Sequence, residues 1–207
     1  MWTSQYVKES FYAKDPATRK EIGAKFRVKG LERDLWQKDF VANRRFLNKY
    51  SSKRYSLPSL SPKRVKAYQK RYNMGDGCFI EHDVELSRQH YLPGTIKIGR
   101  NVVLAKHTFI DYSGNVVIED NVKMAAGVVI ESHHRDLEAF QNGLDVNIPT
   151  NLLIRESAYI GLRAIILDSC SYIGINSRIG AGAVVTKDIP DNATAVGIPA
   201  KVIKINE

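Results

Sequence analysis

Large aliphatic residues recur every six positions over the second half of the chain. They are Ile98, Leu104, Ile110, Ile118, Met124, Ile130, Ile154, Ile160, Ile166, Ile173, Ile179 and Val185. A small residue usually stands four places after each of them, and Gly, Ala or an acid often stands directly after it. A six-residue period fits neither a 3.6-residue helix nor an alternating strand. It predicts short strands joined by sharp turns, with the aliphatic side chain pointing into a tube.

The repeat predicts a parallel β-helix of about five coils, because three such strands complete one coil of about 18 residues. Each coil pairs its backbone groups with the next coil, so stability depends on neighbouring coils. Residues 132–153 (SHHRDLEAFQNGLDVNIPTNLL) interrupt the repeat with polar and loop-forming residues. Extended loops on a regular scaffold usually carry function. We therefore expect residues 79–207 to form a mainly β domain with a functional loop at 132–153.

Helical patterns precede the repeat. Asp15-Pro16 is an N-cap followed by proline at the first helical position, and Gly30 is a natural stop, which predicts a helix over 16–29. Apolar residues spaced by three or four predict a second helix over 31–50. A short third helix is expected to begin at Ser61-Pro62 and to run to Tyr72. Residues 1–78 are thus predicted to be a helical segment.

This N-terminal segment is strongly basic. Residues 1–78 contain 19 of the 31 Lys and Arg residues but only 7 of the 22 Asp and Glu residues. Such a surface could associate peripherally with an anionic surface such as a membrane or another polyanion, whereas the plainer interpretation is a solvated basic face over an aromatic core. The segment shows no signature of a nucleic-acid-binding module, so we expect no nucleic-acid partner.

The composition is that of an ordinary globular protein. Of the 207 residues, 43% are hydrophobic and 26% are charged. No apolar run approaches the ~18 residues that cross a bilayer, and the first residues lack the apolar core of a signal peptide. Cys78 and Cys170 form no disulfide framework and lack metal-ligand spacing, which favours reduced thiols. We expect a cytoplasmic protein.

The repeat resembles the hexapeptide-repeat acyltransferases, in particular their maltose and galactoside O-acetyltransferase branch. The resemblance lies in YIGLRAIIL at 159–167, IGAGAVVTKDIP at 179–190 and VGIPAKVIK at 196–204. It covers about residues 96–204, whereas residues 1–78 are only loosely similar to that branch. It implies a left-handed coil, an exception to right-handed crossovers. It also implies a homotrimer with active sites between subunits and acetyl-coenzyme A as the donor, which passes its acetyl group directly to a hydroxyl.

Direct transfer to a hydroxyl needs a general base with a pKa near neutral, a role suited to histidine. The run Ser132-His133-His134-Arg135-Asp136 stands where the family has its catalytic histidine, and the branch often reads Ser-His-x-His-Asp. This alignment makes His133 the base and leaves His134 as the alternative, with Arg135 in place of a second histidine. Asp111 would bind an acceptor hydroxyl or orient the histidine; the plainer interpretation is an acid at a turn.

The resemblance also implies contacts to the donor. The corresponding positions are Leu162, Ala181, Thr186, Lys201 and Lys204. The first two would offer mainly backbone groups, and the two lysines would attract the phosphates as point charges. For Ala181 and Thr186, the plainer interpretation is packing at a turn.

These features together predict an acetyl-coenzyme A-dependent O-acetyltransferase acting on a sugar or glycan precursor. One alternative is N-acetylation of an amino sugar, because the same base could deprotonate an amine. Another is a non-catalytic scaffold that docks a polyanion or a membrane. Some proteins of this fold bind zinc through three histidines between subunits, but the five histidines here lack a His-x4-His pair, so no metal is predicted.

Overall fold

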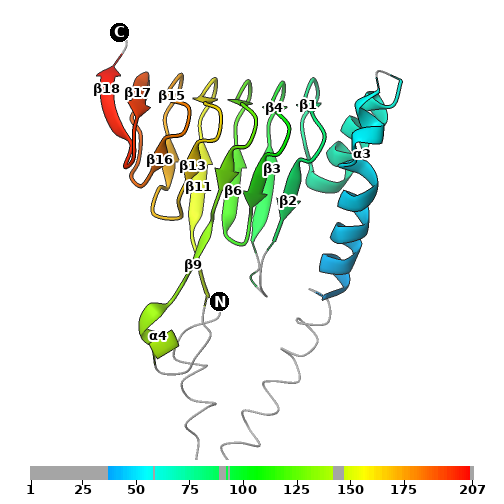
Figure 1. Cartoon of the computed structure of the whole chain (residues 1–207), viewed down its shortest axis with the longest axis horizontal. Coiled ribbons are helices and arrows are strands. Elements are labelled where there is room, and N and C mark those ends of the chain that lie inside the picture. Colours follow the sequence, from blue (N-terminus) through cyan, green and yellow to red (C-terminus); the bar gives the residue numbers. More distant parts are fainter. Residues whose placement is uncertain (1–36, 58, 89–91, 93, 142–146, 206–207) are drawn as a thin grey trace, which may run out of the picture.

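The computed structural model describes residues 37–57, 59–88, 92, 94–141 and 147–205. It is a row of stacked β coils with helices packed at one end (Figure 1). The helical elements are a helix over 37–50, a 3₁₀ turn η1 (Lys53–Ser56), α3 (Ser61–Tyr72) and α4 (Leu137–Gln141). The predicted helix at 16–29 and the start of the second predicted helix lie outside the described residues.

Three sheets form the faces of the tube. The four-stranded sheet contains β3 (Thr95–Ile98), β6 (Asn115–Ile118), β11 (Asn151–Ile154) and β14 (Tyr172–Ile173). The five-stranded sheet contains β2 (Glu85–Ser87), β5 (Phe109–Asp111), β8 (Val129–Ile130), β13 (Ile165–Ile166) and β16 (Val184–Val185). The seven-stranded sheet contains β1 (Phe79–Ile80), β4 (Val103–Leu104), β7 (Lys123–Met124), β12 (Tyr159–Ile160), β15 (Arg178–Ile179), β17 (Ala193–Val196) and β18 (Lys201–Ile205). Strands from successive coils pair in parallel, and among the described strands of these three sheets only β18 pairs antiparallel.

The aliphatic residues of the repeat stack in columns along the inside of the tube. One column is Ile98, Ile118, Ile154 and Ile173, paired strand to strand in the four-stranded sheet. The other two are Leu86, Ile110, Ile130, Ile166 and Val185, and Ile80, Leu104, Met124, Ile160 and Ile179. All of these side chains are buried. The predicted parallel β-helix of about five coils is therefore confirmed.

Two corners of the tube use left-handed backbone conformations. The first corner, between the four- and seven-stranded sheets, has positive φ at Gly77, Asn101, Asn121, Ser157, Asn176 and Asn192. The second corner, between the seven- and five-stranded sheets, has positive φ at Asp83, His107, Gly127, Arg163 and Gly182. Gly, Asn and Asp dominate because they reach this conformation at the least steric cost. The third corner, between the five- and four-stranded sheets, carries the long interruption of the repeat.

The helix over 37–50 and α3 cover the open end of the first coil, and we call them the helical cap. Helix α3 begins at Ser61, as predicted, and buries Arg64, Tyr68 and Tyr72. The Tyr68 hydroxyl donates a hydrogen bond to the Val84 carbonyl (2.7 Å), and the Asn43 amide donates to the Leu86 carbonyl (2.9 Å). The cap thereby supplies hydrogen-bond partners to backbone carbonyls of the first coil that have no preceding coil to pair with.

The cap and the coils share one continuous core, and the boundary at residue 78 stays a prediction. Within the part of the chain that the structure describes, no helix combines the length and the apolar character that crossing a membrane requires.

Candidate active site

The chain leaves the repeat at the third corner, directly after β8. It projects as β9 (His133–Arg135), continues through α4 and returns as β10 (Asn147–Pro149), a hairpin visible below the coils in Figure 1. The Thr150 amide donates to the Ser132 carbonyl (2.8 Å) and closes the base of the hairpin. The chain rejoins the repeat at Asn151, slightly earlier than the predicted loop end at 153, because Leu152 and Ile154 already point into the core.

His133 lies at the base of this hairpin, against Asp111 of the neighbouring coil. The distance from His133 Nδ1 to Asp111 Oδ2 is 2.6 Å. Asp111 ends β5 and its side chain is fully buried, while the His133 side chain is 13% exposed. The structure shows the contact of Asp111 with the histidine, and its role toward an acceptor stays a prediction.

Hydrogen bonds surround the Asp111 carboxylate on both sides. Oδ1 accepts from the backbone amide (3.0 Å) and the hydroxyl of Ser113, and Oδ2 accepts from the amide (3.0 Å) and the hydroxyl (3.2 Å) of Ser132. Burial alone would raise the pKa of Asp111, but the hydrogen bonds, that of His133 first, outweigh it and hold the pKa of this carboxyl below its ordinary value. Asp111 is therefore a carboxylate at neutral pH.

An ionised Asp111 sets the state of His133. Because a carboxylate only accepts hydrogen bonds, Nδ1 of His133 carries the proton that faces Asp111, and Nε2 is the basic nitrogen of the neutral ring. The hydrogen bond to Asp111 raises the pKa of His133 above its ordinary value, against the opposing effect of burial. The pair thus favours proton uptake by the imidazole.

A third ionisable group, Glu131, joins the pair. One carboxylate oxygen of Glu131, one of Asp111 and one ring nitrogen of His133 lie within 4.8 Å of one another. Burial, together with the charge of Asp111, raises the pKa of the Glu131 carboxyl. Sequence reasoning passed over Glu131 because an acid directly after the aliphatic is an ordinary feature of the repeat.

His134 occupies a different environment from His133. Its Nδ1 is 2.8 Å from Asp168 Oδ2, and the two side chains are 45% and 26% exposed. Sequence reasoning also missed Asp168. The register of the coils is the signal that could have revealed Asp168. Ile130 pairs with Ile166, and this pairing places Asp168 beside the start of the hairpin. Of the two candidate bases, only His133 contacts a fully buried carboxylate.

The candidate donor residues lie on other corners and edges of the tube. Leu162 and Ala181 both lie at the second corner on successive coils, where the Gly182 amide donates to the Leu162 carbonyl (2.7 Å). Thr186 directly follows β16, at the third corner, where its carbonyl accepts from the Ser169 hydroxyl (3.0 Å). Lys201 and Lys204 are exposed on β18. The five-stranded sheet therefore separates Leu162 and Ala181 from Thr186, and no described contact joins any of the five to His133.

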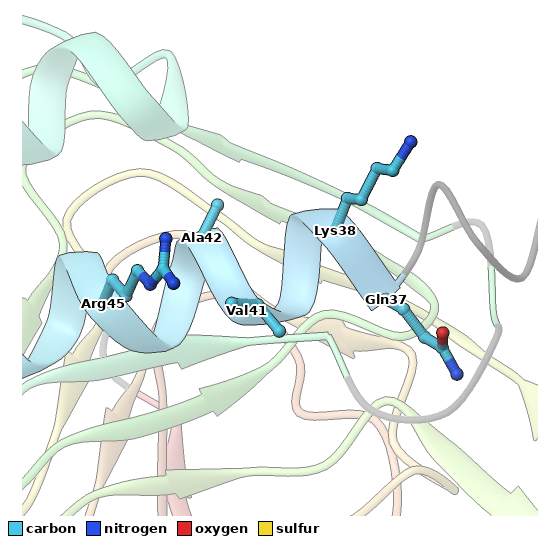
Figure 2. Close-up of a pocket in the computed structure, with 5 residues that line it drawn as sticks. All are labelled: Gln37, Lys38, Val41, Ala42 and Arg45. Atoms are coloured by element: carbon cyan, nitrogen blue, oxygen red, sulfur yellow. The ribbon is translucent and has the colours of Figure 1, made fainter.

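A hollow of about 450 Å³ lies against the outer side of the helix over 37–50. Its described lining residues, shown in Figure 2, are Gln37, Lys38, Val41, Ala42 and Arg45. None of these five side chains is a nucleophile or a base that titrates near neutral pH. The described part of its lining therefore lacks the chemistry of the His133 site.

Comparison with known proteins supports the resemblance seen in the sequence. No family model matches the chain. The galactoside O-acetyltransferase of Escherichia coli is 33% identical over 153 residues, which cover 72% of each chain. An acetyltransferase of Schizosaccharomyces pombe, assigned that activity provisionally, is 38% identical over 120 residues. That match covers 54% of this chain and 56% of the relative, so the chain spans just over half of that relative's length.

Among solved structures, a galactoside acetyltransferase in complex with coenzyme A aligns with a TM-score of 0.70 and 28% identity. The alignment covers 82% of each chain. The structural neighbours are left-handed β-helix acetyltransferases, which confirms the predicted hand of the coil.

Proposed function

Because the chain belongs to the hexapeptide-repeat acetyltransferases, we propose that it transfers an acetyl group from acetyl-coenzyme A to a hydroxyl of a sugar or glycan precursor. The observation that carries this proposal is the His133–Asp111 pair at the base of the only long hairpin within the described repeat. A relative that acts on galactosides favours a sugar hydroxyl as the acceptor.

In the proposed reaction, Nε2 of His133 removes the proton of the acceptor hydroxyl as the oxygen attacks the thioester carbonyl of the donor. A bond forms between that oxygen and the acetyl carbon, and the bond between carbon and sulfur breaks. The departing thiolate takes the proton from the imidazolium, which restores neutral His133. Asp111 remains ionised throughout, because it orients the ring and stabilises the imidazolium without accepting the proton.

We assign donor binding to Leu162, Ala181, Thr186, Lys201 and Lys204. The two lysines are exposed on β18, where they can meet phosphate groups from solvent. Leu162 is 49% exposed, which leaves its corner accessible to the long arm of coenzyme A. The assignment rests on the family resemblance together with this exposure.

We further propose a homotrimer with the sites between subunits. The hairpin exposes large apolar side chains at Leu137 (68%), Phe140 (51%) and Ile148 (37%). Ile198 and Ile203, at the C-terminal edge, are 77% and 65% exposed. Apolar surface of this kind is typical of contact sites between proteins, and a neighbouring subunit would cover it.

The cytoplasm is the compartment we propose. Cys78 and Cys170 are both buried free thiols, which suits a reducing environment.

The test is to replace His133 and His134 separately with alanine. Positioned proton removal typically supplies 10²–10⁴-fold in rate, so His133→Ala should lose turnover on about that scale while His134→Ala loses less. Thiol release from acetyl-coenzyme A is measured with a panel of sugars and glycans, and the acetylated product is identified by mass spectrometry. Donor affinity, measured by calorimetry, should survive in both variants.

The results separate the alternatives. Loss of turnover in His134→Ala alone would move the base by one residue, and full activity in both variants would refute a histidine base. If only amino sugars are acetylated, and on nitrogen, the reaction is N-acetylation. If no member of the panel is acetylated although the donor binds, the scaffold hypothesis gains support.

A further inference from the structure

A second cluster of ionisable side chains lies at the second corner, across the first two coils. Pairing of Ile80 with Leu104 sets Asp83 level with His107 on the adjacent coil, and His82 precedes Asp83. Both Asp83 and His107 have the left-handed corner conformation, with φ of 55° and 60°. The coil register therefore unites residues that no short sequence motif connects.

The three side chains converge on one point. Asp83 Oδ2 lies 3.9 Å from His82 Nε2 and 3.6 Å from His107 Nδ1. Each of the three residues has one potential ligand atom within 4.8 Å of those of the other two. Ligand atoms around a tetrahedral ion, each about 2.0–2.2 Å from it, are roughly 3.3–3.6 Å apart. Small rotations of these partly exposed side chains would close the difference.

A further contact fixes the orientation of His82. Its Nδ1 lies 3.2 Å from the hydroxyl of Ser56 on η1. In the tautomer whose Nδ1–H donates to Ser56, the lone pair is on Nε2, the nitrogen that faces Asp83. Metal-binding histidines are usually held in this way by a partner on the other ring nitrogen.

The charges around the cluster do not block a cation. The Arg64 guanidinium interacts electrostatically with Asp83, but it donates hydrogen bonds to the carbonyls of Tyr50 (2.9 Å), Ser52 (2.8 Å) and Ile80 (3.2 Å) and to the hydroxyl of Ser56 (3.4 Å). Glu81 adds a negative charge on the same segment, where it accepts from the Lys106 amide (2.7 Å).

We propose that His82, Asp83 and His107 bind a divalent transition-metal ion of the zinc type. Two imidazoles and one carboxylate suit Zn²⁺ rather than Mg²⁺ or Ca²⁺, which prefer oxygen ligands. The side chains are 22%, 39% and 58% exposed, so the ion can enter from solvent. It would connect the first coil, the second coil and, through Ser56, the η1 turn between the two helices of the cap. Its role is structural and separate from the acetyl transfer.

The test uses the full chain, freed of metal by a chelator and titrated with zinc chloride in a calorimeter. Wild type should bind one Zn²⁺ at this site with micromolar or tighter affinity. His107→Asn and Asp83→Asn should each weaken binding tenfold or more. Asn is chosen at 107 because other corners of this tube hold Asn in the same conformation. Glu131→Gln, in the cluster around His133, is the matched control and should bind as wild type does.

Thermal unfolding supplies a second readout. Zinc at about 100 times its Kd should raise the Tm of wild type by roughly 5–10 °C, and it should raise that of His107→Asn much less. The Tm of each variant with zinc is compared with the Tm of the same variant without zinc, so a change in stability caused by the substitution itself does not affect the result. The proposal fails if wild type binds zinc more weakly than micromolar, if His107→Asn binds as tightly as wild type, or if the loss occurs in Glu131→Gln instead.

Discussion

At the scale of single residues, the Asp111 carboxylate matters because it is buried and still ionised. Its four hydrogen bonds from Ser113 and Ser132 offset the cost of burying the charge, and that charge faces one nitrogen of His133. A fixed negative charge beside the ring does two things at once. It selects the tautomer, and it stabilises the charged imidazolium that forms during proton transfer.

This arrangement predicts the effect of Asp111→Asn on the pH dependence of turnover. His133 acts as a base only when neutral, so the rate should rise with pH through its pKa. The hydrogen bond to Asp111 raises that pKa, and removal of the carboxylate should therefore shift the rising limb to lower pH. Turnover at the plateau should also fall, by about 10²–10⁴-fold, because the ring loses its orientation.

The measurement is kcat/KM against pH for wild type, Asp111→Asn and Asp168→Asn. Asp168 contacts His134, and its charge adds less to the raised pKa of His133 than the contact with Asp111 does. Its replacement is therefore the control and should shift the rising limb less than Asp111→Asn does. A limb that moves with Asp168→Asn and not with Asp111→Asn would assign the base to His134.

The sequence predicted part of this site and missed part, for a physical reason. The interruption of the repeat marked His133 and His134, because a long polar insertion in a regular coil stands out. Glu131 and Asp168 did not stand out, because each looks like an ordinary corner acid. Their proximity to the histidines depends on which coil stacks on which, and only the register of the coils supplies that information.

At the scale of elements, the two-residue strands of the tube carry one buried and one outward side chain each. In β15, Ile179 is 1% exposed and is stacked on Ile160 of β12, while Arg178 points outward. Such short strands have little independent stability, so the inward columns hold the coils together.

Ile179→Asp should therefore destabilise the protein severely, by about 3–5 kcal/mol, because it places an unpaired charge among aliphatic side chains. Arg178→Asp introduces the same side chain one position away, on the outer surface, and should change stability by no more than about 0.5 kcal/mol. Thermal or denaturant unfolding of both variants tests this. Equal stability of the two would contradict the inward orientation of the column.

The coils were predictable because each six-residue unit has to bury one large aliphatic side chain, which leaves a strict period in the sequence. The paired strands of the hairpin were not, because β9 and β10 carry polar and exposed residues without such a period. The contact of the cap with the first coil depends on buried polar groups such as Arg64 and Asn43, which hydrophobic patterning does not reveal.

At the scale of the whole molecule, charge is segregated to the end that carries the helical cap. Between Asp39 and Asp76 the sequence contains no acid. The exposed cations there are Lys38, Arg44, Arg45, Lys49, Lys53, Arg54, Lys63, Lys66 and Lys70. Asp39 is engaged by Arg71 (3.0 Å) and Arg88 (3.1 Å), so it does little to neutralise them.

This basic face predicts association with vesicles of anionic lipid. Each cation near such a surface contributes about 1 kcal/mol, and the attraction is screened beyond a Debye length of about 8 Å at physiological ionic strength. Binding should therefore be strong at low salt, weaken steeply as salt rises, and be absent with zwitterionic lipid. Co-sedimentation of the protein with vesicles measures it.

The matched variants carry three charge reversals each. Lys63→Glu, Lys66→Glu and Lys70→Glu together remove the outer row of α3, and Lys97→Glu, Lys123→Glu and Arg178→Glu place the same charge change on the coils. Because both triple variants have the same net charge, only the position of the charge distinguishes them. Loss of binding in the α3 variant alone would show that the cap docks the enzyme on an anionic surface. An equal loss of vesicle binding in both triple variants would show that binding depends on net charge and not on the position of the charges. Vesicle binding that does not change with salt would favour the interpretation of a solvated basic face.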